Sequence, residues 1–409
     1  MNESLLQSYA RLIVRTGANV SKGQTVVIRA LVSLEDFVNR VSEECYLAGA
    51  KRVFVHWQSQ KLDRTDALHA AEEDLSFVPP FEEDAHRFMA DELPVLIWLD
   101  GEDPEGLSGV DAAKVARVQQ AKNKVLGKYR AMTENRMQWT IAGVPTKEWA
   151  RKVFPEEKND EEAVEKLWKA ILKTARAEDG KGEENWARHE EELKARCAYL
   201  NSLRLTRLHY HSANGTELTV GLIPGVLFLG GGEKDIQGAF FQPNIPSEEC
   251  FTSPRKGEAE GVAVSSKPLI YKGQRIEDFS VRFEKGKAVE VHARIGEEAL
   301  KSILTIDDGS AYLGECALVP FDSPINQTGI LFMNTLYDEN AACHLALGMG
   351  FTELYPGFEK LGEEEVHKRG INDSLSHVDF MIGTRDLSIV GTRENGEEVP
   401  IFKDGTWAF

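Results

Sequence analysis

A chain of 409 residues with 42% hydrophobic side chains has room for two or three domains and can bury a large core. Acidic residues outnumber basic ones by 66 to 48, which gives a formal net charge of −18. Because nucleic acids and anionic membranes attract basic surfaces, this balance argues against both as principal partners.

The chain opens with a helical pattern. Residues 1–14, MNESLLQSYARLIV, are amphipathic at helical spacing, and we expect a helix over 4–16. They contain no basic leader followed by an uninterrupted apolar core, so no signal peptide is predicted. No stretch approaches the roughly 18 apolar residues of a membrane span. The 5 cysteines include no C-x-x-C pair, which favours free thiols in a reducing compartment, and we expect a cytoplasmic protein.

Short apolar runs then alternate with helical patterns. This alternation is typical of an α/β domain with a mainly parallel sheet. The elements expected are a strand at 25–30, a helix at 34–48, and strands at 52–57 and 94–100.

Residues 157–203 are highly charged and helical in pattern. Within 164–175, Leu167, Trp168 and Ile171 belong to an apolar stripe with helical spacing, and the charges beside it form a solvated face. We interpret these helices as the end of an N-terminal α/β domain that covers residues 1–203.

From residue 204 the pattern changes to strands and tight turns. Asn395-Gly396 and Asp404-Gly405 are hairpin turn signals, and one helical segment is expected near 338–348. We therefore predict a β-rich α+β domain over 204–409, and the segments described next make it the expected metal-binding, catalytic domain. The clearest expected strands are 217–222, 279–283, 288–293 and 387–390.

Four short segments of this second domain hold acids or imidazoles in apolar surroundings. Several carboxylates with histidines are what a site for two zinc-like cations needs. In one segment, His377 and Asp379 alternate on an expected strand, so both side chains should point to one face, where Asp379 could bridge two cations. The segments are 244-NIPSEECFTSP-254, 313-LGECALVP-320, 338-DENAACHLALG-348 and 376-SHVDFMIG-383, and together they offer Glu248, Glu249, Glu315, His344, His377 and Asp379.

Each of these residues also has a structural interpretation. Glu315 could pair with an arginine, and His377 could be a hydrogen-bonded core histidine. Rival groups elsewhere in this half are the His209–His211 pair and the acids Asp307 and Asp308, for which we favour a turn-capping role.

Other common enzyme motifs do not occur. The run GGGE at 230–233 is not followed by the Gly-Lys-Ser/Thr of a phosphate loop, so we interpret it as a hinge or turn. The chain has no G-x-S-x-G nucleophile motif and no H-E-x-x-H zinc motif.

The four segments, in this order, resemble those of the thermophilic metallo-aminopeptidase family, with its aminopeptidase T and aminopeptidase S types. The stretch 11-RLIVRTGANVSKGQTVVI-28 is similar to the family's N-terminal region. The resemblance implies that two divalent cations (zinc, cobalt or magnesium) are bound by five residues, and that the protein forms homodimers with an enclosed active site. The implied ligands are Glu249, Glu315, His344 (on the helical segment that we expect near 338–348), His377 and Asp379.

The expected activity is therefore that of a metal-dependent aminopeptidase. Water activated by two metal ions would release the first residue from peptides with a free N-terminus. Glu248 is our candidate general base, provided that it lies in a loop, because on a strand its side chain would point away from that of Glu249. Alternatives are another dinuclear amidase, such as a dipeptidase, or a degenerate, non-catalytic ligand-binding protein.

Two further expectations concern neighbours of the implied ligands. Family members usually carry a tyrosine seven residues after the metal-binding histidine, but this chain has Phe351 there, and Tyr355 is our candidate for the missing catalytic phenol. Cys250, Cys316 and Cys343 adjoin implied ligands, and on strands they should face away from the metal and pack as small apolar residues.

Overall fold

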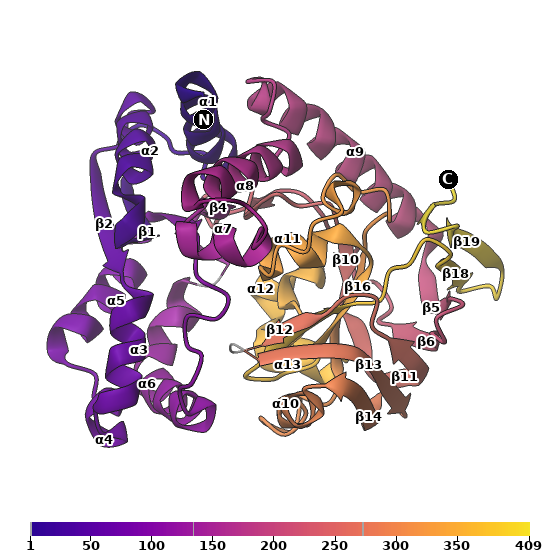
Figure 1. Ribbon diagram of the computed structural model, residues 1–409. Coiled ribbons are helices and arrows are strands. Elements are labelled where there is room, and N and C mark those ends of the chain that lie inside the picture. The colour runs from indigo at the N-terminus through magenta and orange to yellow at the C-terminus, as the bar shows by residue number, and fades with distance from the viewer. Residues whose placement is uncertain (1, 134, 272–273) are drawn as a thin grey trace. The chain divides into compact units, whose positions relative to one another are not determined.

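The alternating elements of the first half form a parallel sheet (Figure 1), as the pattern predicts. The computed structural model describes residues 2–133, 135–271 and 274–409. Its two units are unit 1, Met1–Arg188 with Gly232–Pro246, and unit 2, His189–Gly231 with Ser247–Phe409.

The sheet of unit 1 has the order β2-β1-β3-β4-β9, and all its strand pairs are parallel. Alternate residues of β1 and β3 are buried because successive side chains point to opposite faces. The strands are β1 (Thr25–Leu31), β2 (Arg52–Gln58), β3 (Val95–Asp100), β4 (Trp139–Gly143) and β9 (Asn244–Ile245), with a separate hairpin of β7 (Glu233–Lys234) and β8 (Phe240–Phe241).

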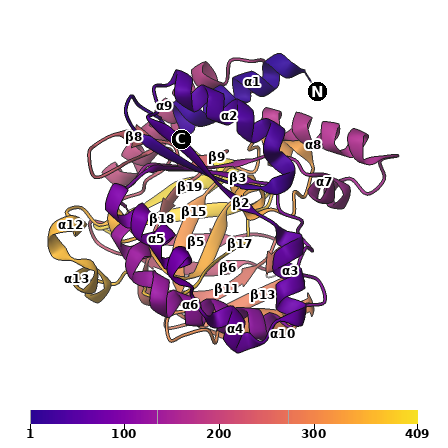
Figure 2. The ribbon, with the colours of Figure 1, turned by 90° about the vertical axis from the view of Figure 1, so that its left-hand side faces the viewer.

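Helices follow or connect these strands, and Figure 2 shows them around the sheet. The apolar stripe expected in α8 is buried at Leu167, Trp168 and Ile171, which confirms its role as the packing face. The helices are α1 (Glu3–Leu12), continued by a π-helical turn (Ile13–Gly17), a 3₁₀ turn (Val32–Leu34), α2 (Glu35–Leu47), α3 (Gln60–His69), α4 (Glu72–Ser76), α5 (Pro80–Glu92), α6 (Ala112–Thr133), α7 (Lys147–Val153), α8 (Asp160–Thr174) and α9 (Gly182–Leu203).

The division into units differs from the expected boundary at 203/204 in two respects. It falls inside α9, after Arg188, and residues 232–246 return to unit 1. This return adds β9 to the edge of the parallel sheet, beside β4. A two-residue strand has no recognisable sequence pattern, so the return could not have been expected.

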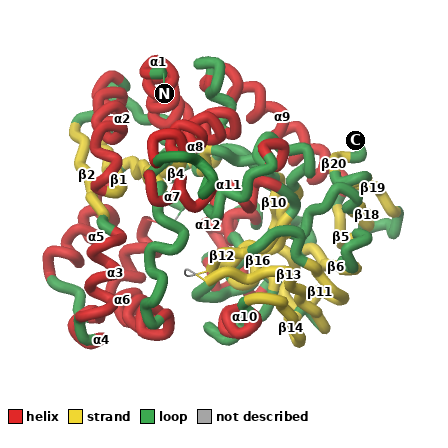
Figure 3. The backbone as a smooth tube through the Cα atoms, viewed as in Figure 1, coloured by secondary structure: helices red, strands yellow, loops and turns green. Residues whose placement is uncertain are grey.

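Unit 2 is built on antiparallel strands. Figure 3 shows these strands in yellow. The turn signals are confirmed: Gly396 donates to Arg393 O between β18 and β19, and Asp404 and Gly405 both have positive φ between β19 and β20. Its large sheet has the order β12-β13-β11-β6-β5-β18-β19-β20, with β14 also paired to β13. The strands are β5 (Leu205–His211), β6 (Glu217–Leu222), β11 (Pro254–Val264), β12 (Leu269–Tyr271), β13 (Gln274–Glu284), β14 (Lys287–Ile295), β18 (Ser388–Arg393), β19 (Glu398–Lys403) and β20 (Thr406–Trp407).

A second sheet of unit 2, called the site sheet below, carries the residues of interest. It has the order β10-β15-β16-β17, with every pair antiparallel. Its strands are β10 (Cys250–Thr252), β15 (Leu313–Leu318), β16 (His344–Gly348) and β17 (His377–Met381). The helices and 3₁₀ turns of unit 2 outside α9 are α10 (Glu297–Ile303), η3 (Asn326–Thr328), α11 (Thr335–Asp338), η4 (Glu339–Ala341), η5 (Thr352–Leu354), α12 (Phe358–Leu361) and α13 (Glu363–Lys368).

The helix expected near 338–348 is wrong in its second half. The segment begins with the end of α11 and the turn η4, but from His344 it is the strand β16. All residues of β16 are buried, and a strand buried on both faces reads as a continuous apolar run, which spacing alone does not separate from a buried helix. His344 is therefore a strand residue rather than a helix residue.

One face of the site sheet closes the core of unit 2. Cys316, Leu345 and Phe380 point from it into a cluster that also contains Leu208, Val220 and other residues of the large sheet. The opposite face, called the front face below, is left for polar side chains. Among the described residues, no helix is both long and apolar enough to cross a membrane.

Candidate metal centre

All five implied ligands project from the front face of the site sheet. Strand alternation places Glu315, His344, His377 and Asp379 there, and Glu249 directly precedes β10 at the same parity as the front-face residue Phe251. The cysteines fall on the other face: Cys250, Cys316 and Cys343 are buried in the apolar core, as expected.

Small residues separate the charged side chains on this face. Ala346 lies opposite Glu315 on one side and Asp379 on the other, and Ala317 lies opposite His344. Neighbouring side chains in such a row stand about 4.5–5.5 Å apart, so each alanine leaves space between polar groups. The register thus provides room above the sheet for ions between the carboxylates.

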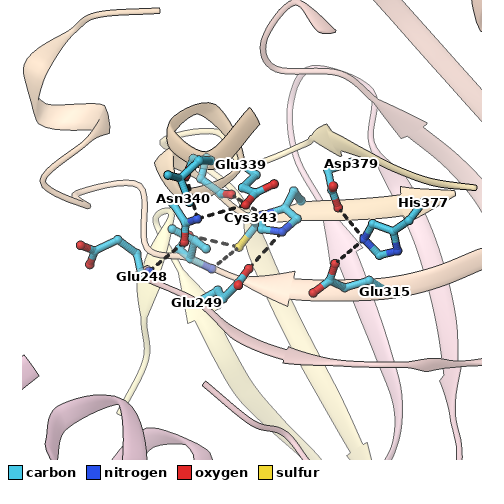
Figure 4. A network of polar contacts seen from close by, with 12 residues as sticks. Glu248, Glu249, Glu315, Glu339, Asn340, Cys343, His377 and Asp379 are labelled. Carbon is cyan, nitrogen blue, oxygen red and sulfur yellow. Dashed lines mark hydrogen bonds and ion pairs between the residues drawn. The ribbon is translucent and has the colours of Figure 1, made fainter. Parts of the chain in front are cut away.

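The side chains converge in two groups that share Glu315. Ligand atoms of Glu249, Glu315 and His344 lie within 4.8 Å of one another, and so do those of Glu315, His377 and Asp379. His344 Nε2 is 3.2 Å from Glu249 Oε2, while His377 Nε2 is 3.2 Å from Glu315 Oε2 and 3.1 Å from Asp379 Oδ1. In Figure 4 the carboxylates of Asp379 and Glu315 approach the same ring nitrogen of His377, one from above and one from below.

Backbone carbonyls orient both imidazoles. His377 Nδ1 lies 2.8 Å from Met349 O, and His344 Nδ1 lies 3.3 Å from Ala342 O. A proton on each Nδ1 satisfies these contacts and leaves Nε2 free to coordinate, which is the usual arrangement around a metal-binding histidine. The sequence predicted a need for such acceptors but did not identify Met349 and Ala342.

The electrostatics show how costly this cluster is without a cation. Burial raises the pKa of Glu315 to about 7, and the neighbouring acids Glu249 and Asp379 add to the rise while His377 opposes it. Burial opposes charge on His344 as well, but the surrounding carboxylates outweigh it and raise its pKa to about 10. The pKa of Glu315 rises because burial and nearby like charges disfavour its ionised form. The pKa of His344 rises because nearby carboxylates stabilise its protonated form.

The donor set fits divalent cations. Glu249 Oε2 is buried and makes no hydrogen bond with a described residue, and its ionic neighbour is His344 Nε2, 3.2 Å away. Buried carboxylates without compensating charge are strongly unfavourable. Carboxylate oxygens with imidazole nitrogens are ligands that zinc-like metals accept.

Comparison with known proteins is consistent with this donor set. The sequence pattern of the thermophilic metalloprotease family (M29) matches residues 2–407. The chain belongs to this family. The family resemblance seen in the sequence is thereby confirmed.

Full-length M29 relatives carry aminopeptidase names. Aminopeptidase AmpS of Bacillus subtilis is 40% identical over 405 residues, covering 99% of this chain and 98% of the relative. Aminopeptidase T of Thermus thermophilus is 39% identical over 403 residues, covering 98% of each. The solved structure of wild-type AmpT from Thermus thermophilus matches with a TM-score of 0.91 at 38% identity, covering 99% of both chains, and supports the predicted fold class.

Glu339 joins this M29 cluster but was not among the predicted residues. Its pKa is raised well above the ordinary value, first by burial and then by the charges of Asp379 and Glu249. Figure 4 shows Glu339 beside Asn340, next to the implied ligands. Asn340 Nδ2 lies 3.4 Å from the Glu339 carboxylate. Glu339 lies five residues before His344, within a segment that the sequence analysis already named as a candidate for the site. That position is the sequence signal that could have identified it.

The side chain of Glu248 points away from the implied ligands (Figure 4). It lies in the loop before β10, the condition under which it could have joined Glu249, yet Figure 4 shows its carboxylate pointing away from the cluster. Its Oε2 lies 3.8 Å from His189 Nε2, and its backbone N donates to Asn340 Oδ1 at 2.8 Å. These two contacts are with His189 and Asn340 rather than with the implied ligands, and the base role of Glu248 stays a prediction.

Tyr355 and Phe351 lie in different surroundings. Tyr355 OH accepts a 2.7 Å hydrogen bond from Arg369, and its ring packs beside a small core cluster around Val366. The structure does not bring this phenol to the implied ligands. Phe351 is close to them instead, with its ring centroid 5.1 Å from that of His377.

The rival polar groups have local partners. His209 and His211 both contact Glu217 on the neighbouring strand, at 3.1 and 2.7 Å. Asp307 accepts hydrogen bonds from Gly309 N and other turn amides, which confirms its preferred capping role.

Proposed function

We propose that this chain, a metallo-aminopeptidase by family, releases the first residue of peptides at a pair of divalent cations. Glu249, Glu315 and His344 would hold one ion, and Glu315, His377 and Asp379 the other. The sharing of Glu315 by both groups carries the proposal. Glu315 would thus serve both ions, whereas the sequence suggested Asp379 for the shared role.

When bound, zinc, cobalt or magnesium ions would supply a water of lowered pKa and polarise the scissile carbonyl. The residues of the chain supply positioning and proton transfer. Met349 O and Ala342 O fix the imidazoles, and the strands of the site sheet hold the carboxylates rigidly.

Glu339 is the acid best placed to accept a proton from the attacking water and return it to the leaving amine. Burial raises the pKa of Glu339, and the charges of Asp379 and Glu249 add to the rise, so its carboxyl lies within electrostatic reach of the cluster. Glu339, which is not among the ligands, would attract the positively charged α-amine of a peptide when it is ionised. These features favour cleavage next to a free N-terminus.

Metal-dependent hydrolysis of leucyl-p-nitroanilide tests the proposal. Wild-type protein should lose activity to a chelator and recover it on addition of cobalt or zinc, and elemental analysis should find two ions per chain. Glu315→Gln should abolish both activity and full metal loading. Glu217→Gln is the matched control because Glu217 is exposed and its carboxylate contacts His209 and His211, which lie outside the cluster.

Chelator-resistant activity, or full activity in Glu315→Gln, would rule out this mechanism. Cleavage of dipeptides without cleavage of longer peptides would instead establish a dipeptidase. Two bound ions with no hydrolysis of any peptide would establish a non-catalytic protein.

A further inference from the structure

Two phenylalanines form an apolar border to the otherwise charged cluster. Phe251 lies on the front face of β10, in one row with Ala317 and His344. Phe351 follows β16, and its ring centroid is 5.2 Å from that of Phe251 and 5.1 Å from that of His377. Both phenylalanines are only partly buried, so part of each ring remains available to a ligand.

Both rings are mounted on fixed backbone. Phe251 exchanges two hydrogen bonds with Leu229, at 2.8 and 3.0 Å, in addition to its pairing in the site sheet. Phe351 N donates to Ser253 Oγ at 2.8 Å. A surface that is rigid before binding loses little conformational freedom when a ligand packs on it.

The position of this border determines which part of a peptide can meet it. If the scissile carbonyl and the α-amine lie at the cluster, the carbon between them carries the side chain of the first residue. That side chain must therefore lie immediately beside the ligands. Phe351 beside His377, and Phe251 packed against Phe351, offer an apolar surface at this place.

We propose that Phe251 and Phe351 form the wall that receives the side chain of the first residue, and that the enzyme selects large apolar first residues such as leucine, phenylalanine and methionine. This inference rests on the proposed function. A single methylene group in an apolar pocket changes kcat/KM by about 10–200-fold, so loss of one ring should alter selectivity measurably.

The test compares kcat/KM for leucyl-, phenylalanyl- and alanyl-p-nitroanilide in cobalt-loaded protein. Phe351→Ala should lower the leucine-to-alanine ratio by about tenfold or more. Phe351→Leu, which keeps an apolar side chain, should retain part of the preference and covers the case in which the alanine variant does not fold. Phe409→Ala is the matched control because Phe409 is 46% exposed and contacts Tyr199 and Trp407 instead.

Unchanged ratios in a Phe351 variant that still binds two ions would overturn this inference and leave the proposed function standing. The same holds if the variant alters preference only for the second residue of the peptide. An inactive, metal-loaded wild type would instead overturn the proposed function and this inference with it.

Discussion

Removing the charge of Glu315 should stabilise the metal-free protein while destroying its site. The pKa of this buried carboxyl rises from 4.5 to about 7. At 1.36 kcal/mol for each pKa unit, ionised Glu315 lowers the free energy of unfolding by up to about 3 kcal/mol above pH 7. Because its folded pKa is raised, this carboxyl favours folding most below pH 4.5, and that contribution is lost as the pH rises to about 7.

Glu315→Gln keeps the side-chain shape and removes the titration. Metal-free Glu315→Gln should therefore be more stable than wild type at pH 8, by up to about 3 kcal/mol, with the difference disappearing near pH 4. Urea unfolding in the presence of chelator measures both values. Glu191→Gln, which changes an exposed acid of α9, should leave the pH dependence unaltered.

Metal should remove most of the variant's advantage in stability. Free cation at 100 times its Kd stabilises a protein that binds it only when folded by about 2.7 kcal/mol, and Glu315→Gln should lose most of this gain. A metal-free variant less stable than wild type at pH 8, or equal stabilisation of both proteins by metal, would refute the reasoning.

The remaining predictions concern the acids and aromatic side chains. Glu339→Gln should lower kcat by about 10²–10⁴-fold at unchanged metal content, whereas Glu248→Gln should change kcat far less; the reverse order would restore Glu248 as the base. Cation binding should release protons and tighten as the pH rises through about 7, because metal displaces protons from the cluster, and calorimetry in two buffers of different ionisation enthalpy would show no release if the cluster is not the site. Phe351→Tyr should raise kcat if a phenol beside the cluster assists the reaction, and Tyr355→Phe should not lower it, because that hydroxyl bonds Arg369; a large loss in Tyr355→Phe would contradict this assignment.

Strand periodicity carried most of what the sequence could reveal about the site. The alternation of His377 and Asp379 predicted a shared face, and β17 shows that face. The cysteines beside the implied ligands were expected on the opposite face for the same reason, and they are in the core. These inferences succeed because side-chain direction on a strand depends only on residue parity.

Features that depend on tertiary contacts could not be predicted from the sequence. β16 is buried on both faces, so its sequence resembles a helix as much as a strand. Glu248 and Glu339 differ in direction only because of the local backbone of a loop and a 3₁₀ turn, which have no sequence period. The carbonyl partners of the imidazoles, Met349 and Ala342, are backbone groups and leave no trace in side-chain chemistry.

A crystal structure of the cobalt- or zinc-loaded protein, with anomalous scattering recorded at the metal edge, tests the central claim most directly. The account predicts two anomalous peaks about 3.5–4 Å apart, with Glu315 between them, His344 on one and His377 on the other. A single peak, or ions bound away from Glu315, would contradict it.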